Sequence, residues 1–124
     1  MNKVKIKSVI PYAQYEQLIY SYKIICLLPS NQEIVVIDEN PYDLTFFIDK
    51  FVFIKLATSN FILNSKYDSF TGNIFVSSID KLFYFKNDDI EVLLPKDLCL
   101  DYNLKDNQKV EISFRDLLLK EYKF

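Results

Sequence analysis

Between residues 71 and 114, strand-like hydrophobic runs and polar turns follow one another in a regular order. Strand-like runs at residues 71–79, 82–85 and 90–95 are separated by short polar turns rich in Asp and Asn. A helix-like insert at residues 96–104 and a polar turn then lead to a last alternating run at residues 110–114. Alternation with a period of two is typical of half-buried strands. This order of strand, strand, strand, helical turn and strand predicts a small antiparallel β-barrel or sandwich.

The first half of the chain shows similar patterning. Val4 and Ile6 alternate with lysines, which predicts a strand with one buried face and one solvated face whose lysines protect a sheet edge. Paired strands are predicted at residues 22–28 and 33–38, because a polar turn separates them. For residues 13–18 we expect a helical turn, and for residues 44–48 a short helix or a loop with a buried edge.

Residues 50–60 form the most apolar run, with Lys55 as the only charged residue between Phe51 and Leu56. Neither face of such a strand can be fully solvated, so we expect a central strand covered on both sides. The residues expected in its core are Phe51, Phe53, Ile54 and Leu56. Their expected partners are Ile74, Val76, Val92, Leu94, Val110 and Ile112.

Composition supports one β-rich domain spanning residues 1–124. Half of the 124 residues are hydrophobic and 26% are charged, which are ordinary globular values. Aromatic residues reach 16%, whereas Ala occurs only at positions 13 and 57, so strands are favoured over helices. Scarce Ala, Gly and Arg beside abundant Ile, Asn and Lys indicate an AT-rich coding sequence, as in a low-GC bacterium or its phage.

Residues 71–114 resemble an oligonucleotide/oligosaccharide-binding (OB) barrel. The matching features are the opening Thr71-Gly72, the meander, and a polar turn that precedes a Val-x-Ile strand at residues 110–112. Asp106-Asn107 occupies the turn where a Gly-Asp pair is common. SH3-like barrels share this layout, so the resemblance implies an architecture and no function. The predicted fold class is mainly β: a single antiparallel β-barrel or sandwich, OB-like or a related Greek key, with one or two short helical turns.

Several kinds of catalytic and binding site are not expected, because the chain lacks the residues that they need. The chain has no His, which removes Ser-His and Cys-His nucleophile pairs. Gly72 is the only glycine, so no phosphate-cradling loop is expected. Cys26 and Cys99 cannot form a four-ligand zinc site and lie in apolar runs, which predicts buried free thiols with a raised pKa. We therefore predict no catalytic residue, no cofactor and no metal site, and we do not expect an enzyme.

The remaining candidates are carboxylates, tyrosines and lysines. The carboxylates, expected as solvated turn residues, form two groups: Asp38, Glu39 and Asp43, and Asp88, Asp89 and Glu91. The candidate partner-binding residues are Tyr12, Tyr15, Tyr20 and Tyr22, because Tyr provides large contact area at low entropic cost. Ordinary packing of these tyrosines stays open. Under an alternative interpretation, the phosphate contacts are Lys3, Lys5 and Lys7.

The functional expectation follows from these exclusions. The net charge of −2 and the single Arg, Arg115, argue against a polyanionic partner. We expect a cytoplasmic, non-catalytic protein-binding module, of the immunity or inhibitor type or an accessory subunit of a phage or bacterium. The alternative is an OB-like module that binds single-stranded nucleic acid. No apolar run approaches the ~18 residues of a membrane span, so no membrane partner is expected.

Overall fold

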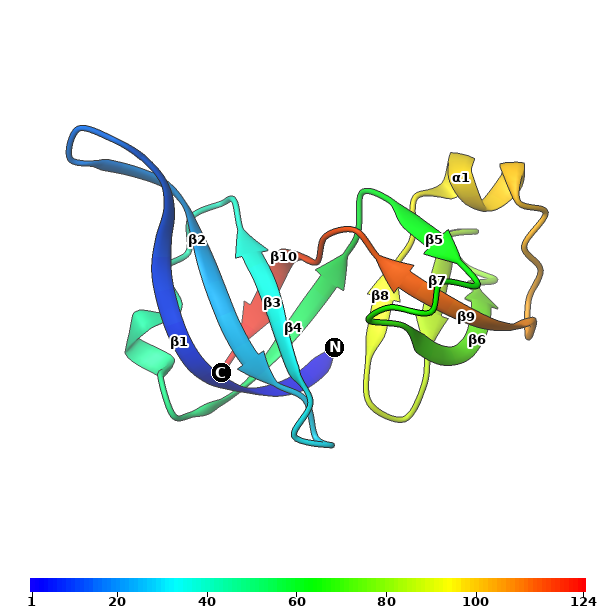
Figure 1. Cartoon of the computed structure of the whole chain (residues 1–124), viewed down its shortest axis with the longest axis horizontal. Helices are drawn as coiled ribbons and strands as arrows, with labels where there is room; N and C mark the ends of the chain where they lie inside the picture. Colours follow the sequence, from blue (N-terminus) through cyan, green and yellow to red (C-terminus); the bar gives the residue numbers. More distant parts are fainter. The chain divides into compact units, whose positions relative to one another are not determined.

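The structure, a computed structural model, describes all residues from Met1 to Phe124 and is mainly β (Figure 1). Ten strands account for most of the ordered backbone, with one six-residue α-helix and one four-residue 3-10 helix. The chain forms two compact units. Unit 1 comprises Met1–Leu56 and Leu117–Phe124, and unit 2 comprises Ala57–Asp116. The mainly β class is therefore confirmed, and so are two short helical turns, one within residues 44–48 and one within residues 96–104.

The strands follow the two units along the chain. Those of unit 1 are β1 (Asn2–Tyr15), β2 (Leu18–Leu27), β3 (Glu33–Asp38), β4 (Phe51–Ala57) and β10 (Leu118–Lys123), with the 3-10 helix η1 at Leu44–Phe47. Those of unit 2 are β5 (Phe61–Leu63), β6 (Phe70–Val76), β7 (Phe83–Lys86), β8 (Glu91–Leu93) and β9 (Lys109–Phe114), with α1 at Lys96–Asp101. No helix is long and apolar enough to cross a membrane.

Unit 1 is a ring of hydrogen-bonded strands. Its order is β1-β2-β3-β10-β4, and β1 also pairs with β4 through Asn2–Lys5 and Phe51–Ile54. Because β4 returns to lie beside β1, the first four strands have the order β4-β1-β2-β3 of a Greek key. β10 pairs in parallel with β3 at Leu118 and Ile37, so the sheet is mixed. The prediction of a wholly antiparallel sheet is wrong in this respect.

The side chains of β4 correct the predicted core. Val52, Ile54 and Leu56 are buried, whereas 59% of Phe51 and 45% of Phe53 are exposed. Alternation along residues 51–56 places Phe51, Phe53 and the half-buried Lys55 on the outer face. The prediction that Phe51 and Phe53 lie in the core is therefore wrong. Ile54 and Leu56 do lie in a core, that of unit 1, while their six expected partners all belong to unit 2.

The core of unit 1 is aliphatic. Val4 and Ile6 are buried as the lysine alternation predicted, and the lysines of β1 do lie on the opposite face. The other fully or almost fully buried side chains of this core are Ile24, Cys26, Leu28, Val36, Leu44, Val52, Ile54, Leu56 and Leu119. Burying such side chains supplies roughly 1.5–3 kcal/mol each, so this face of the ring, and not its outer face, stabilises unit 1.

Unit 2 contains residues 71–114, the stretch whose runs and turns predicted a meander. Its strand order is β8-β7-β6-β9-β5, and the β5–β9, β9–β6, β6–β7 and β7–β8 pairs are antiparallel. The predicted order of three strands, a helical turn and a strand over residues 71–114 is confirmed. Gly72 is required for packing, because a Cβ there would lie 2.4 Å from the Lys86 carbonyl oxygen and 2.7 Å from the Phe85 ring.

Asn and Asp take the turn positions that glycine fills in other proteins. Of the nine residues with positive φ, seven are Asn or Asp, and none is Gly. The side chain of Asn87 accepts hydrogen bonds from the backbone N–H groups of Asp89 and Ile90, both at 2.8 Å. In the turn at residues 80–81 the left-handed residue is Lys81, with φ of 61°, and not Asp80. Local hydrogen bonds from Asn and Asp side chains thus stabilise the turns in the absence of glycine.

Unit 2 lies in sequence between two neighbouring strands of unit 1. β4 runs opposite to β1, while β10 runs parallel to β3 and therefore in the direction of β1. β4 and β10 are neighbours in the strand order, so they are antiparallel and correspond to the two strands of a hairpin whose connection is unit 2. The prediction of a single domain over residues 1–124 stays a prediction.

Candidate functional site

The β1–β2 hairpin extends beyond its neighbours in unit 1 (Figure 1). The pairing of β1 with β4 ends at Lys5, and the pairing of β2 with β3 begins at Tyr22. Residues 12–20, which we call the arm, are therefore paired only within the β1–β2 hairpin, with partners such as Tyr15 and Leu18. Glu16, with φ of 56°, forms the tip of the hairpin. The helical turn expected at residues 13–18 is thus wrong, and a strand and a turn stand there.

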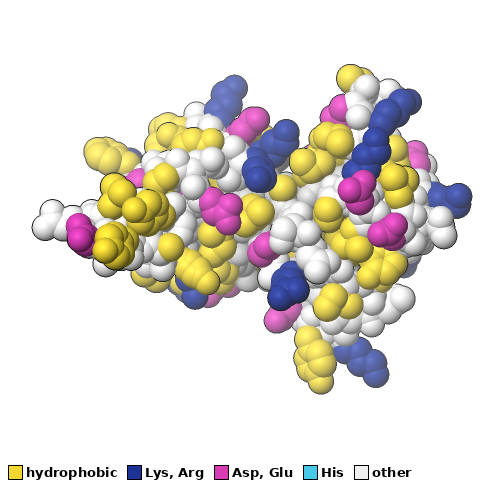
Figure 2. Space-filling view, turned by 90° about the horizontal axis from the view of Figure 1, so that it is seen from above, with side chains coloured by type: hydrophobic (Ala, Val, Ile, Leu, Met, Phe, Trp, Pro, Cys, Tyr) yellow, Lys and Arg dark blue, Asp and Glu magenta, His cyan; other side chains and the backbone are white.

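The arm is exposed and almost uncharged. Every residue of the arm except Ile19 is exposed, and Ile19 is half-buried. Hydrophobic side chains gather over the arm, at the left of the view in Figure 2. Glu16 is the only charged residue between Ser8 and Tyr22, although charged residues make up 26% of the chain. A shallow hollow of about 400 Å³ at the tip is lined by Tyr15, Glu16, Gln17, Leu18 and Tyr20.

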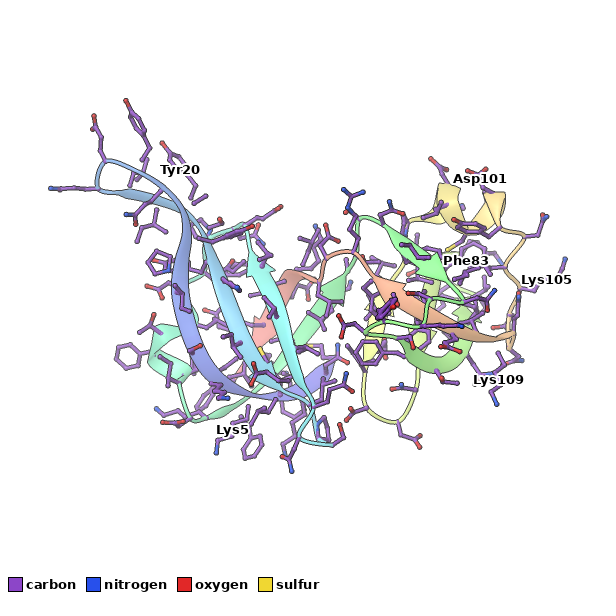
Figure 3. The ribbon with its side chains drawn as sticks, in the orientation of Figure 1. Lys5, Tyr20, Phe83, Asp101, Lys105 and Lys109 are labelled. Carbon is purple, nitrogen blue, oxygen red and sulfur yellow. The ribbon has the colours of Figure 1, made fainter.

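Three of the four candidate tyrosines lie together on the arm. The exposed fractions are 59% for Tyr12, 68% for Tyr15 and 51% for Tyr20, which is labelled in Figure 3. Tyr22 lies outside the arm and opposite Asp38 of β3. Desolvation raises the pKa of the Tyr22 hydroxyl, and Asp43 raises it further through its charge and a hydrogen bond. Tyr22 is therefore not part of the arm. The exposed apolar side chain of Leu18 lies beside Tyr15 and Tyr20 at the tip instead.

The three candidate lysines of β1 have different surroundings. Lys7 Nζ donates to Glu33 Oε2 at 2.8 Å, which neutralises its charge locally. Lys3 Nζ lies 5.0 Å from the centroid of the Phe51 ring. Lys3 and Lys5 both lie within the β1–β4 ladder, opposite Phe53 and Phe51. The expectation that these lysines protect a free sheet edge is therefore wrong for Lys3 and Lys5.

Asp38 and Asp43 of the first carboxylate group organise a turn, whereas Glu91 of the second group lies in β8 opposite Lys86. Asp38 is fully buried and accepts hydrogen bonds from the backbone N–H groups of Asn40 at 3.2 Å and Asp43 at 3.0 Å. Asp38 is thus a structural residue. The expectation that it is a solvated turn residue is wrong. Asp43 caps η1 by accepting from the Thr45 N–H at 3.2 Å. No group of three or more His, Cys, Asp or Glu side chains could hold a metal ion.

Both cysteines are buried free thiols, as predicted. Burial raises the pKa of the Cys26 thiol to about 12, and it raises the pKa of the Cys99 thiol to about 12 as well. No positive charge contributes to either shift. A thiol with so high a pKa carries almost no nucleophilic thiolate at neutral pH.

Sequence patterns missed the outward position of Phe51 and Phe53. The signal was present, because Lys55 shares their parity in the strand and must reach water.

Comparisons with known proteins add no template for the site: no protein-family model matches the chain, and no curated protein or solved structure is significantly similar to it. The surfaces described above must therefore be interpreted from their own chemistry.

Proposed function

We propose that the protein is a non-catalytic protein-binding module that contacts its partner through the arm. The observation that carries this proposal is the arm itself, an exposed, nearly uncharged and tyrosine-rich hairpin. A solvated hairpin of ordinary composition would carry about four charged residues among the fifteen from Ser8 to Tyr22, and this one carries Glu16 alone. The cores of protein interfaces are depleted in charge and enriched in Tyr.

The geometry of the arm supports the same function. An isolated two-stranded hairpin is only marginally stable in water, so a partner that packs on the arm would stabilise it. The backbone edge of β2 from Leu18 to Ser21 has no neighbouring strand except β1, and it can accept a strand from a partner. On the β1 side, Pro11 lacks an N–H and irregular pairing follows it, which disfavours uncontrolled strand addition there.

The architecture of unit 1 is consistent with a binding module. We propose that unit 1, with its five-strand ring and Greek-key order, is the OB-like part of the chain, and that the resemblance seen at residues 71–114 reflects general features of small β-domains. Such a fold hosts many functions, so the arm and not the ring indicates what is bound. An immunity or inhibitor-type protein, or an accessory subunit of a phage or bacterium, fits a rigid β-domain that presents an aromatic hairpin.

The test is affinity capture from the source cell with a matched pair of variants. Tyr15→Asp combined with Tyr20→Asp places charge on the arm without disturbing a buried residue. Interface tyrosines often contribute ~2 kcal/mol or more, so we expect this double variant to bind a stoichiometric partner at least about tenfold more weakly than the unaltered chain. The control is Tyr67→Asp, because Tyr67 is 83% exposed and belongs to unit 2.

The capture has two informative negative results. Recovery of no stoichiometric protein by the unaltered chain would contradict a protein-binding function. Equal recovery by the unaltered chain and the arm variant would leave a partner but exclude the arm as its contact. Urea titrations of both variants establish that the comparison is made between folded proteins.

A further inference from the structure

Two aromatic rings of unit 1 point outward from the same face of β4. Phe51 and Phe53 are 59% and 45% exposed, and they are two residues apart on one strand. The outward positions of a strand whose other face lies on a core are usually polar, as Lys55 is here. Exposed rings at neighbouring outward positions gain nothing from the core of unit 1, so packing does not explain why these positions are aromatic.

Lysines lie directly beside these rings. The register places Lys3 opposite Phe53 and Lys5 opposite Phe51, and Lys3 Nζ reaches diagonally to within 5.0 Å of the Phe51 ring centroid. Figure 3 labels Lys5 on the half of β1 that lies away from the arm tip. Both lysines lie in a paired ladder, so protection of a sheet edge does not account for them either. Lys7, in contrast, is bound to Glu33 and is excluded from the site.

The lysines and Phe51 form one wall of a groove. Its volume is about 310 Å³, and its remaining wall comes from the end of β2 and the β2–β3 turn. The lining residues are Lys3, Lys5, Leu27, Leu28, Pro29, Asn31 and Phe51. Two ammonium groups and no carboxylate line this groove, although the chain as a whole has a net charge of −2. The volume lies at the lower end of small-molecule sites, at a size suited to about one nucleotide.

We propose that this face of unit 1 binds single-stranded nucleic acid. One base stacks on Phe51 in the groove, the phosphates beside it contact Lys3 and Lys5, and the next base stacks on Phe53. The two rings are separated by roughly 6.8 Å along the strand, twice the rise per residue, so they provide successive platforms and favour a strand over a free nucleotide. Stacking and phosphate contacts tolerate any base, so little sequence preference is expected.

The experiment is a fluorescence-anisotropy titration of the full chain with a labelled oligothymidylate of about twelve nucleotides at ~50 mM salt. We expect saturable binding that weakens with salt by about 1.4 log units of affinity per log unit of salt, which corresponds to two phosphate contacts. Phe51→Ala should weaken binding by roughly 5- to 150-fold. Lys3→Gln with Lys5→Gln should remove most of the salt dependence. Thymidine monophosphate should bind much more weakly than the oligomer.

Unit 2 offers a matched control. Lys86 Nζ lies 4.2 Å from the centroid of the Phe75 ring, but Glu91 lies 3.7 Å from the same Nζ. Phe75→Ala and Lys86→Gln remove a comparable exposed ring and a comparable cation, and they should leave binding unchanged. Far-UV circular dichroism and urea titration of every variant exclude unfolding as the cause of a loss.

Three results would overturn the proposal. The first is the absence of binding at low salt. The second is binding that the lysine substitutions abolish but that Phe51→Ala and Phe53→Ala do not affect, because this would describe attraction to any polyanion. The third is equal affinity for the monophosphate and the oligomer. None of these results bears on the arm, which is tested separately by affinity capture.

Discussion

Two neighbouring residues of β4, Phe53 and Ile54, have opposite surroundings. Ile54 is 1% exposed in the core of unit 1, whereas Phe53 is 45% exposed on its outer face. The larger side chain therefore contributes less to stability than the smaller one, because stabilisation depends on the area removed from water. The position of a residue in the alternation, and not its hydrophobicity, decides this difference.

The corresponding prediction concerns three single substitutions. Ile54→Ala should lower the free energy of unfolding by about 2–5 kcal/mol, through lost transfer energy and the cavity left behind. Phe53→Ala should cost far less, and Lys5→Ala should change the stability by less than about 0.5 kcal/mol. Urea titration measures all three. A larger effect for Phe53→Ala than for Ile54→Ala would mean that the outer face of β4 is covered in solution.

The two thiols give a second prediction at this scale. Because burial raises each pKa to about 12, native Cys26 and Cys99 should react slowly with a thiol reagent at pH 7. Unfolding in urea should make both react fast, since an exposed thiol has a pKa of about 8.5. Mass spectrometry of the labelled chain follows each cysteine. Fast labelling of either cysteine in the folded protein would reopen a nucleophilic role for it.

The same raised pKa values set the direction of a pH effect. Between about pH 8.5 and pH 12 the unfolded thiols lose protons while the folded ones keep them. The unfolded state then binds fewer protons, so stability falls as pH rises through this window. Below about pH 8.5 both states carry protonated thiols, and their contribution to stability is fully present.

Secondary-structure elements could be predicted from the sequence where apolar runs are bounded by clear polar turns. The strands of residues 22–28 and 33–38 and the meander of unit 2 are such runs, and they are found at the expected places. The arm could not be predicted as a hairpin, because irregular pairing near Pro11, Ala13 and Gln14 breaks the alternation. A pattern disturbed by bulges looks like a helical turn.

The candidate surfaces were predicted only in part for a related reason. Composition identified the tyrosines, but only strand pairing shows that Tyr12, Tyr15 and Tyr20 share the arm and that Tyr22 does not. Likewise the lysines of β1 are evident in the sequence. Phe51 and Phe53 lie beside them only because β4, about fifty residues further along the chain, pairs with β1. Local patterns carry no information about which strand becomes the neighbour.

At the scale of the whole molecule, the position of unit 2 in the sequence is the main feature that local patterns did not predict. A single chain of regular strands gives no sign that β10 completes the ring of unit 1 after an interval of some sixty residues. The ends of unit 2 are held together within it. Asp116 accepts hydrogen bonds from the Ser59 N–H at 2.7 Å and the Thr58 hydroxyl at 3.0 Å, and Arg115 N–H donates to the Asn60 carbonyl oxygen at 3.0 Å.

These features lead to a prediction about folding independence. Replacing Ala57–Asp116 by an Asn-Gly turn joins Leu56 to Leu117, and the antiparallel β4 and β10 then form an ordinary hairpin. At roughly 60 residues the shortened chain buries only ~60% of its unfolded surface, so we expect it to fold cooperatively but with lower stability. Circular dichroism in a urea titration measures the transition, and residues 57–116 expressed alone provide the complementary fragment.

If both fragments are unfolded while the full chain shows one cooperative transition, the protein is a single folding domain, as its length and composition predict. If the shortened chain folds, it should also retain the oligonucleotide affinity of the full chain, because Lys3, Lys5, Phe51 and Phe53 all belong to unit 1.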